Sequence, residues 1–205
     1  MKKNEKLLDI VFILDKSGSM YGSEKDTIGG YNSYIENFKD KNAKITTVLF
    51  DNKYEMITKR EDVSKVSKLT EKEYCVGGTT ALLDAIGNSI LYIEKEKAKK
   101  VMFIITTDGY ENSSTEFNKE KIKSMIKKHK EWEFIYIGAD IDSYAEGESI
   151  GISKSNIASY TKSKKGISTM FNTLCCVSEE YCKNDSINYN WKKELDNDIE
   201  ENQNK

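Results

Sequence analysis

The sequence predicts an α/β domain with a doubly wound, mostly parallel central sheet, one antiparallel edge strand and helices on both faces. Three observations lead to this fold class. Short apolar runs alternate along the chain with segments of helical periodicity. The run Val101–Thr106 is almost wholly apolar and rich in β-branched residues, which is typical of a central strand covered on both faces. The pair Asp51-Asn52 separates two strand-like runs and favours a β-hairpin, so one edge strand is expected to be antiparallel.

The first half of the chain contains three strand-like and two helix-like segments. Strands are recognised by short apolar or alternating runs, and helices by apolar residues that recur every three or four positions. The expected elements are a buried strand over 8–14, a helix from Ser23 to Phe38, hairpin strands over 44–50 and 53–57, a Gly-rich loop over 76–80, and a helix with an apolar face over 82–93 and a solvated charged end over 94–100.

The second half repeats the alternation. Its strongest strand, 101–106, ends at Thr107-Asp108-Gly109. Ser113 and Glu116 have the spacing of a capping box for the next helix. The expected elements after this strand are a helix over 117–130, a strand over 133–137, a short helix over 141–150, a weak strand over 156–160 and an amphipathic helix over 167–181.

The length of 205 residues is typical of one domain. We expect that domain to occupy residues 1–183. Residues 184–205 are polar and charged apart from a few apolar positions, so they are predicted to form a C-terminal tail that is partly disordered or a loosely docked helix.

Charge, hydropathy and cysteine usage argue against a nucleic-acid or membrane partner and favour one cellular compartment. The 32 Lys+Arg residues nearly balance the 34 Asp+Glu residues, so no overall field would recruit nucleic acid. No stretch approaches the roughly 20 apolar residues that span a bilayer, so no membrane association is expected. Asp9 interrupts the first apolar run, which therefore does not suit a signal peptide. The four cysteines lack zinc spacing and are expected to be reduced thiols, which favours the cytoplasm.

Oxygen-bearing side chains follow two predicted strands and precede one helix. Ligands of open α/β sheets gather at the carboxyl ends of the strands, where these side chains are expected to meet. Hydroxyl and carboxylate oxygens with few carboxylates suit a hard divalent cation such as Mg²⁺. The candidate metal ligands are Asp15, Ser17, Ser19, Thr80 and Asp108.

The chain resembles the von Willebrand factor type A domain family, whose Rossmann-like domains carry a metal-ion-dependent adhesion site. That site has the pattern Asp-x-Ser-x-Ser, then a Thr, then an Asp usually followed by Gly. The matching residues are Asp15-Lys16-Ser17-Gly18-Ser19, Thr80 and Asp108-Gly109, within a resemblance over roughly residues 8 to 181. Thr79 and Thr80 both fit the second element, and the family spacing to Ala85-Ile86 favours Thr80.

The resemblance implies a complete metal-ion-dependent adhesion site and a protein-binding function without enzymatic activity. The five residues would hold Mg²⁺ or Mn²⁺, with Ca²⁺ as a further candidate, and a partner protein would supply a Glu or Asp to the metal. Partner identity and oligomeric state stay open. In some relatives the last helix moves with metal coordination, and here 167–181 occupies the comparable place.

Three alternatives compete with this interpretation. A haloacid-dehalogenase-like phosphatase would use Asp15 as nucleophile, although Ser17 stands where that family places a second Asp. A hydrolase would combine Ser19, Asp108 and His129, the one histidine of the chain. The third alternative is an assembly subunit of an ATPase-linked complex, whose ATPase would be a separate protein because this chain has no P-loop.

Overall fold

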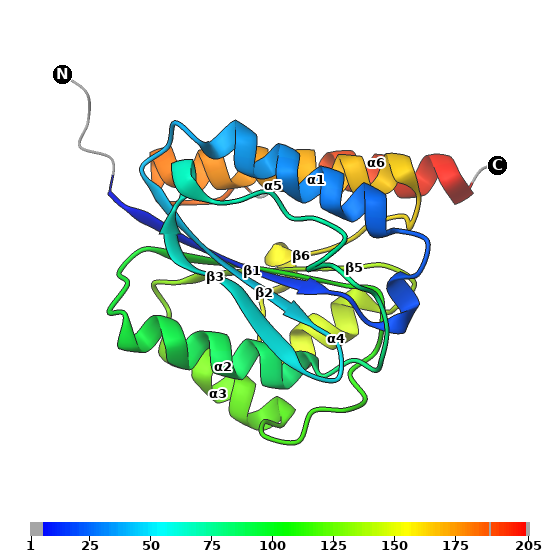
Figure 1. Cartoon of the computed structure of the whole chain (residues 1–205), viewed down its shortest axis with the longest axis horizontal. Coiled ribbons are helices and arrows are strands. Elements are labelled where there is room, and N and C mark those ends of the chain that lie inside the picture. Colours follow the sequence, from blue (N-terminus) through cyan, green and yellow to red (C-terminus); the bar gives the residue numbers. More distant parts are fainter. Residues whose placement is uncertain (1–5, 189, 204–205) are drawn as a thin grey trace.

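The structure is a computed structural model that describes residues 6–188 and 190–203 (Figure 1). Residues 1–5, 189 and 204–205, which belong to the predicted domain and tail, lie outside the described residues. Within the described part, six strands form one sheet in the order β3-β2-β1-β4-β5-β6. The strands are β1 (Leu8–Asp15), β2 (Ala43–Phe50), β3 (Tyr54–Asp62), β4 (Val101–Thr107), β5 (Glu133–Gly138) and β6 (Ile157–Ser159).

The sheet is parallel except for its edge strand β3. β1 pairs in parallel with β2 and β4, and β5 pairs in parallel with β4 and β6, whereas β3 runs antiparallel to β2. The predicted fold class is therefore confirmed, because buried parallel strands and one hairpin edge are both present.

Strand β3 is longer than the predicted 53–57. It continues to Asp62 through a register irregularity near Arg60, whose φ of 49° is left-handed. The Arg60 guanidinium donates to the Asp9 carboxylate at 2.7 Å and so ties the bulged edge to the central strand β1. The charged run at this exposed edge lacks the apolar alternation that marks a strand, so periodicity alone ends it early.

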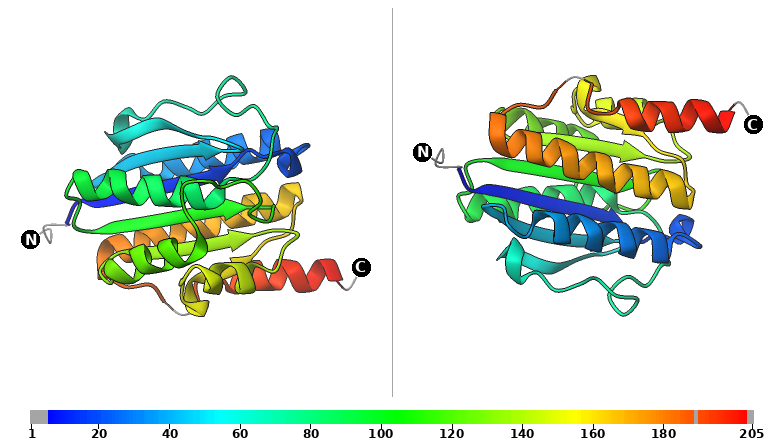
Figure 2. Two further views of the ribbon diagram at one scale, coloured as in Figure 1. Left: turned by 90° about the horizontal axis from the view of Figure 1, so that it is seen from below. Right: turned by 90° about the horizontal axis from the view of Figure 1, so that it is seen from above.

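Helices cover both faces of the sheet (Figures 1 and 2). One face carries α1, α5 and α6, and the other carries α2, α3 and α4. The helices are α1 (Glu24–Phe38), α2 (Leu82–Lys95), α3 (Lys119–Lys128), α4 (Ser143–Ser149), α5 (Lys164–Asn184) and α6 (Lys193–Gln203). The fully buried β1 contributes alternate residues to the two apolar layers, which explains why its sequence is apolar at every position between Asp9 and Asp15. Among the described residues, no helix is long and apolar enough to cross a membrane.

Helix α3 begins two residues later than predicted, and the Ser113–Glu116 capping box does not form. The cap is Asn118, whose side chain accepts a hydrogen bond from the backbone N–H of Lys121 at 2.8 Å. The backbone N–H of Glu116 is instead bound by the Asp84 carboxylate at 2.9 Å. The Asp84 carboxylate on α2 thus keeps the segment around Glu116 outside the helix. Local residue spacing could not indicate this contact, because Asp84 is far away in the chain.

The C-terminal segment contains helix α6 and lies against β6 and α5. Leu195 is 1% exposed, and the Trp191 indole N–H donates to the Ser155 carbonyl at 2.8 Å. The Lys192 ammonium donates to the Ile157 carbonyl at 2.7 Å. These contacts join the segment to the end of the sheet that carries β6.

Two adjacent glycines of α1 give a test of the helix packing. A Cβ on Gly30 would lie 2.1 Å from the Phe171 ring of α5, whereas a Cβ on Gly29 would meet nothing within 4 Å. We expect Gly30→Ala to destabilise the fold by about 1–3 kcal/mol through overpacking. Gly29→Ala should stabilise it by about 0.5–1 kcal/mol, because alanine is the better helix former. Urea unfolding of both variants measures the difference, and equal stabilities would contradict this α1–α5 packing.

Candidate metal centre

Three loops meet at the carboxyl ends of β1 and β4. The parallel register pairs Leu14 with Thr106, so the residues that follow the two strands emerge at the same edge of the sheet. The Gly-rich loop before α2 lies beside the first of these loops, because the N–H of Gly18 donates to the carbonyl of Gly78 at 3.1 Å. The predicted site residues therefore share one edge.

Asp15 is buried at the end of β1 and is fixed from three sides. Its Oδ1 accepts a hydrogen bond from the backbone N–H of Ser17 at 2.7 Å, and its Oδ2 accepts from the Thr107 hydroxyl at 2.6 Å. The buried Tyr74 hydroxyl donates to the Asp15 carbonyl. Burial, followed by repulsion from Asp15, raises the pKa of Tyr74 well above its usual value, so this hydroxyl stays a donor.

The two serines link Asp15 to Asp108. The hydroxyl oxygens of Ser17 and Ser19 lie 2.9 Å apart, and the Ser19 hydroxyl donates to Asp108 Oδ1 at 2.5 Å. Ser19 belongs to a single 3₁₀ turn over Gly18–Met20, which directs its side chain back toward β4. Ser17, Ser19 and Asp108 thus form a chain of oxygen contacts, and the Ser17 N–H joins Asp15 to it.

Thr80 completes the group. A Cβ placed on Gly109 would lie 3.0 Å from Thr80 Oγ1 and 3.2 Å from Ser19 Oγ, so both hydroxyls converge on this glycine. The missing side chain at position 109 is what leaves room for them. Thr80 is 3% exposed, whereas Thr79 lies at the surface. The structure therefore brings Thr80, and not Thr79, to the other four residues.

Residues that sequence reasoning did not assign to the site hold Thr80 in place. The Asn112 side chain accepts from the Thr80 N–H at 2.9 Å, and the Asn112 N–H donates to the Thr80 carbonyl at 3.0 Å. Glu111 accepts from the N–H of Leu83 at 2.9 Å, at the start of α2. These residues follow the Asp108-Gly109 motif closely, but their pairing with the Gly-rich loop is visible only in three dimensions.

Asp84, which lies on α2, anchors the loop that follows β4 and carries Glu111 and Asn112. Its carboxylate accepts hydrogen bonds from the backbone N–H groups of Thr115, Glu116 and Phe117 at 2.8–2.9 Å. The side chain is only 8% exposed, so this one carboxylate replaces water for three donors. Asp84 therefore positions the loop that carries the partners of Thr80.

The electrostatics of the cluster are dominated by burial of Asp15. Burial raises the pKa of Asp15 from 3.8 to about 6, while the hydrogen bonds from Ser17 and Thr107 lower it and repulsion from Asp108 raises it further. Burial destabilises the ionised form of this carboxylate, and a nearby positive charge stabilises that form. The cluster is therefore suited to attract a cation.

The donor set fits a hard divalent cation. Within residues 6–188 and 190–203, no three His, Cys, Asp or Glu side chains gather where they could hold a metal. The cluster offers two carboxylates and three hydroxyls, which are oxygen donors of the kind that Mg²⁺, Mn²⁺ and Ca²⁺ take. Asp108 Oδ2 is buried and accepts no aligned hydrogen bond in the described structure, although the Lys162 ammonium lies 2.8 Å away, so this oxygen is available to a cation.

A lysine that sequence reasoning missed lies against the cluster. The Lys162 ammonium is 2.8 Å from Asp108 Oδ2, without the alignment of a hydrogen bond, and it donates to the Ser19 carbonyl. Lys162 is 143 residues from Ser19 in the chain, so no local motif connects them.

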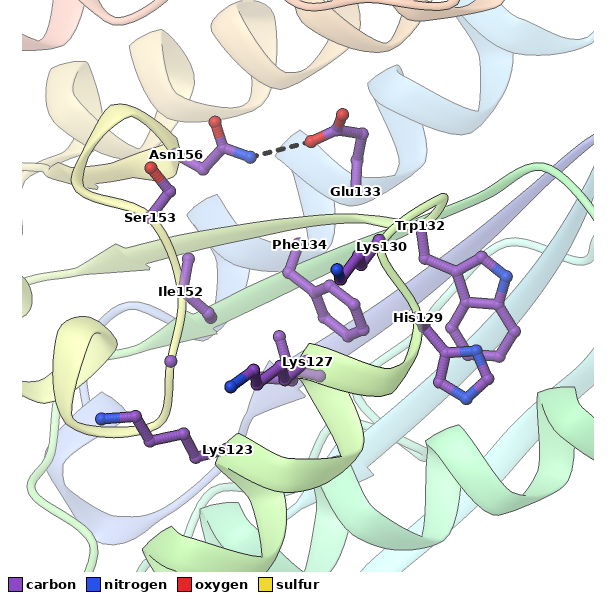
Figure 3. Close-up of a pocket in the computed structure, with 12 residues that line it drawn as sticks. Lys123, Lys127, His129, Lys130, Trp132, Glu133, Phe134, Ile152, Ser153 and Asn156 are labelled. Atoms are coloured by element: carbon purple, nitrogen blue, oxygen red, sulfur yellow. Dashed lines mark hydrogen bonds between the residues drawn. The ribbon is translucent and has the colours of Figure 1, made fainter.

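The hydrolase triad is not assembled. His129 ends α3 near the start of β5, whereas Asp108 follows the end of β4, which is parallel to β5. The His129 ring hydrogen-bonds to Glu94 at 2.7 Å and stacks on Trp132 at 3.7 Å. It borders a hollow of about 380 Å³ between α3 and β5, shown in Figure 3 together with Lys123 and Lys127. The interpretation with Ser19, Asp108 and His129 is therefore wrong, because the fold separates them.

The fold and the cluster together define an open α/β domain with a group of oxygen-bearing side chains at the carboxyl ends of its central strands, the edge where ligands of such sheets gather. The model of the von Willebrand factor type A domain family matches residues 9–172, and the chain belongs to that family. This confirms the family predicted from Asp15, Thr80 and Asp108. The complete metal-ion-dependent adhesion site stays a prediction.

Solved structures share this fold. Proximal thread matrix protein 1 from the mussel byssus has a TM-score of 0.62 and 19% identity, over 82% of this chain and 45% of that protein. A further structure of it is described as having a zinc-occupied adhesion-site motif. The pilus adhesin SpaC from Lactobacillus rhamnosus GG has a TM-score of 0.70 and 15% identity, over 89% of this chain and 31% of that one.

A third structure corresponds to this chain in length. The vWF domain of the type V pili tip protein Mfa5 from Porphyromonas gingivalis has a TM-score of 0.65 and 9% identity, over 88% of this chain and 98% of that one. By contrast, this chain spans less than half of the mussel protein and about a third of SpaC. At these identities the likeness shows the fold. No curated protein matches the sequence.

Proposed function

We propose that this chain is a divalent-metal-dependent protein-binding domain. Asp15, Ser17, Ser19, Thr80 and Asp108 would hold Mg²⁺ or Mn²⁺, with Ca²⁺ as a further candidate, and a partner protein would add a Glu or Asp. The observation that carries the proposal is the convergence of three hydroxyls on Gly109, where Ser17 is hydrogen-bonded to Asp15 through its N–H and Ser19 to Asp108 through its hydroxyl.

The charge of the donor set supports an acidic partner. Two carboxylates balance a divalent charge only if both are ionised, and hydroxyls contribute none. The two carboxylates can at most cancel the divalent charge, so the donor set would leave no excess negative charge to repel an incoming anion from the metal. Adhesins, pilins and a matrix protein among the solved structures with this fold favour a binding role.

We infer that the domain is not an enzyme. For the phosphatase alternative, Asp15 would have to reach a phosphorus atom, but this side chain is 1% exposed and both carboxylate oxygens accept hydrogen bonds. Lack of turnover of an aryl phosphate with Mg²⁺ is expected. A role as an assembly subunit of an ATPase-linked complex would use the same site with a different partner.

We also propose a cytoplasmic location. Each of the four cysteines is a thiol in the described structure, and burial raises the pKa of Cys175 to about 11, which protects it from oxidation. Cys75 and Cys176 are exposed, and a reducing compartment would keep them as thiols.

Affinity capture tests the binding role. The immobilised chain should retain a protein from a lysate of its source cells in about 10 mM Mg²⁺, which is tenfold above a millimolar Kd, and release it in EDTA. The Asp15→Asn chain should retain none in either buffer. A partner that stays bound equally in EDTA and to the variant would overturn the proposal.

A further inference from the structure

The Lys162 side chain occupies the mouth of the cluster. Its ammonium lies 2.8 Å from Asp108 Oδ2 and donates to the carbonyl of Ser19, so it contacts two of the three loops that form the site. The Asp108 side chain has no exposed surface, while Lys162 retains 22%. The lysine therefore approaches the buried carboxylate from the solvent side.

The loop between β6 and α5 holds Lys162 in this position from both sides. The hydroxyl of the preceding residue, Thr161, donates a hydrogen bond to Asp198 of α6, and Asp198 is 4% exposed. The following Ser163 caps α5 by accepting from the N–H of Gly166 at 3.0 Å. A Cβ on Gly166 would lie 2.0 Å from the Thr161 carbonyl, so the loop folds closely onto the first turn of α5.

We propose that Lys162 is a built-in competitor of the divalent cation, a residue that sets how tightly this chain binds metal. The inference rests on the proposed function, since it assumes the metal site. The ammonium neutralises Asp108 Oδ2 in the same position from which that oxygen would bind a metal. Entry of a divalent cation therefore requires Lys162 to move away from Asp108, and metal affinity is lowered by the strength of this ion pair.

The chemistry of lysine suits this role. Its ammonium is a compact charge on a flexible four-carbon stem, so it can leave the carboxylate without any change in the backbone that carries it. Its partly exposed position lets the released charge enter water. The anchoring of its neighbours to α5 and α6 keeps the loop close to the cluster, which makes the lysine an effective competitor.

Mg²⁺ affinity measured by isothermal titration calorimetry tests the proposal. Lys162→Met keeps the stem and removes the charge, and Lys162→Gln provides a second neutral variant. Lys164→Gln is the matched control, because it removes the same charge two residues away at an exposed position. We expect the neutral variants to bind Mg²⁺ about tenfold more tightly than the natural chain. The control should stay within about twofold of the natural chain, and Lys162→Arg, which keeps the positive charge, should not bind Mg²⁺ more tightly than the natural chain.

Thermal unfolding gives an independent readout. In EDTA, Lys162→Met should unfold at a lower temperature than the natural chain, because Asp108 loses its counter-charge. In saturating Mg²⁺ the variant should gain more stability than the natural chain. Equal Mg²⁺ affinities of the natural chain and both neutral variants would overturn the inference and leave the proposed function intact. No Mg²⁺ binding by any of the proteins would overturn the proposed function itself.

Discussion

Asp15→Asn is expected to stabilise the protein in EDTA at pH 7 and to remove its stabilisation by Mg²⁺. The asparagine keeps an oxygen for the Ser17 N–H and presents an amide to the Thr107 hydroxyl, so the local hydrogen bonds survive. It removes a buried negative charge. With the pKa of Asp15 raised from 3.8 to about 6 by burial, the gain should be about 2–3 kcal/mol.

The pH dependence of this gain follows from the direction of the shift. The folded protein holds the Asp15 proton up to a higher pH than the unfolded chain does, because the pKa in the fold is the higher one. Without metal, this group therefore lowers stability as the pH rises from about 4 to 6, with no further change above. The difference between Asp15→Asn and the natural chain should shrink as the pH falls from 6 to 4 and vanish below about pH 3, where Asp15 is protonated in both states.

Calorimetric melting in EDTA and in Mg²⁺ measures both effects. The free energy of unfolding of the natural chain should rise by about 2.7 kcal/mol when Mg²⁺ is present at 100 times its Kd. The variant should gain nothing. A variant that is stabilised by Mg²⁺ as much as the natural chain would show that Asp15 is not a ligand.

Asp84→Ala is expected to cost about 3–5 kcal/mol of folding free energy, since three backbone N–H groups would lose a charged acceptor. The same change should weaken metal binding, because the anchored loop carries Asn112, which holds Thr80. Asp84→Asn should have an intermediate effect. The asparagine oxygen can still accept hydrogen bonds from the backbone, whereas its NH₂ group would face one of the backbone N–H donors.

Urea unfolding in EDTA measures the loss of stability, and Asp196→Ala serves as the control because this acid is exposed on α6. The control should lie within about 0.5 kcal/mol of the natural chain. If Asp84→Ala were as stable as the control, the loop would be held by other contacts.

The sequence was sufficient for the parts of the fold that depend on local pattern. Apolar runs indicate β1 and β4, and Asp51-Asn52 indicates the hairpin, because burial on two faces and turn chemistry are directly visible in the residue types. The end of β3 was missed because a bulge at Arg60 and a long-range ion pair with Asp9 sustain a charged strand.

The candidate site divides in the same way. Asp15, Thr80 and Asp108 could be predicted because they lie at or close to the ends of regular elements, whose order determines where they meet. Lys162 and Asn112 could not, because each acts on a residue far away in the chain through a contact that no spacing encodes. The start of α3 was misplaced for the same reason, since its upstream N–H groups are bound by a carboxylate on α2.

Titration of Mn²⁺ into the natural chain, followed by the paramagnetic resonance signal of the free ion, tests the central claim most directly. We expect one Mn²⁺ to bind per chain and to be displaced by excess Mg²⁺, and we expect none to bind at the same concentrations to the Asp15→Asn variant. Equal loss of the free-ion signal with both proteins, or no loss with the natural chain, would contradict it.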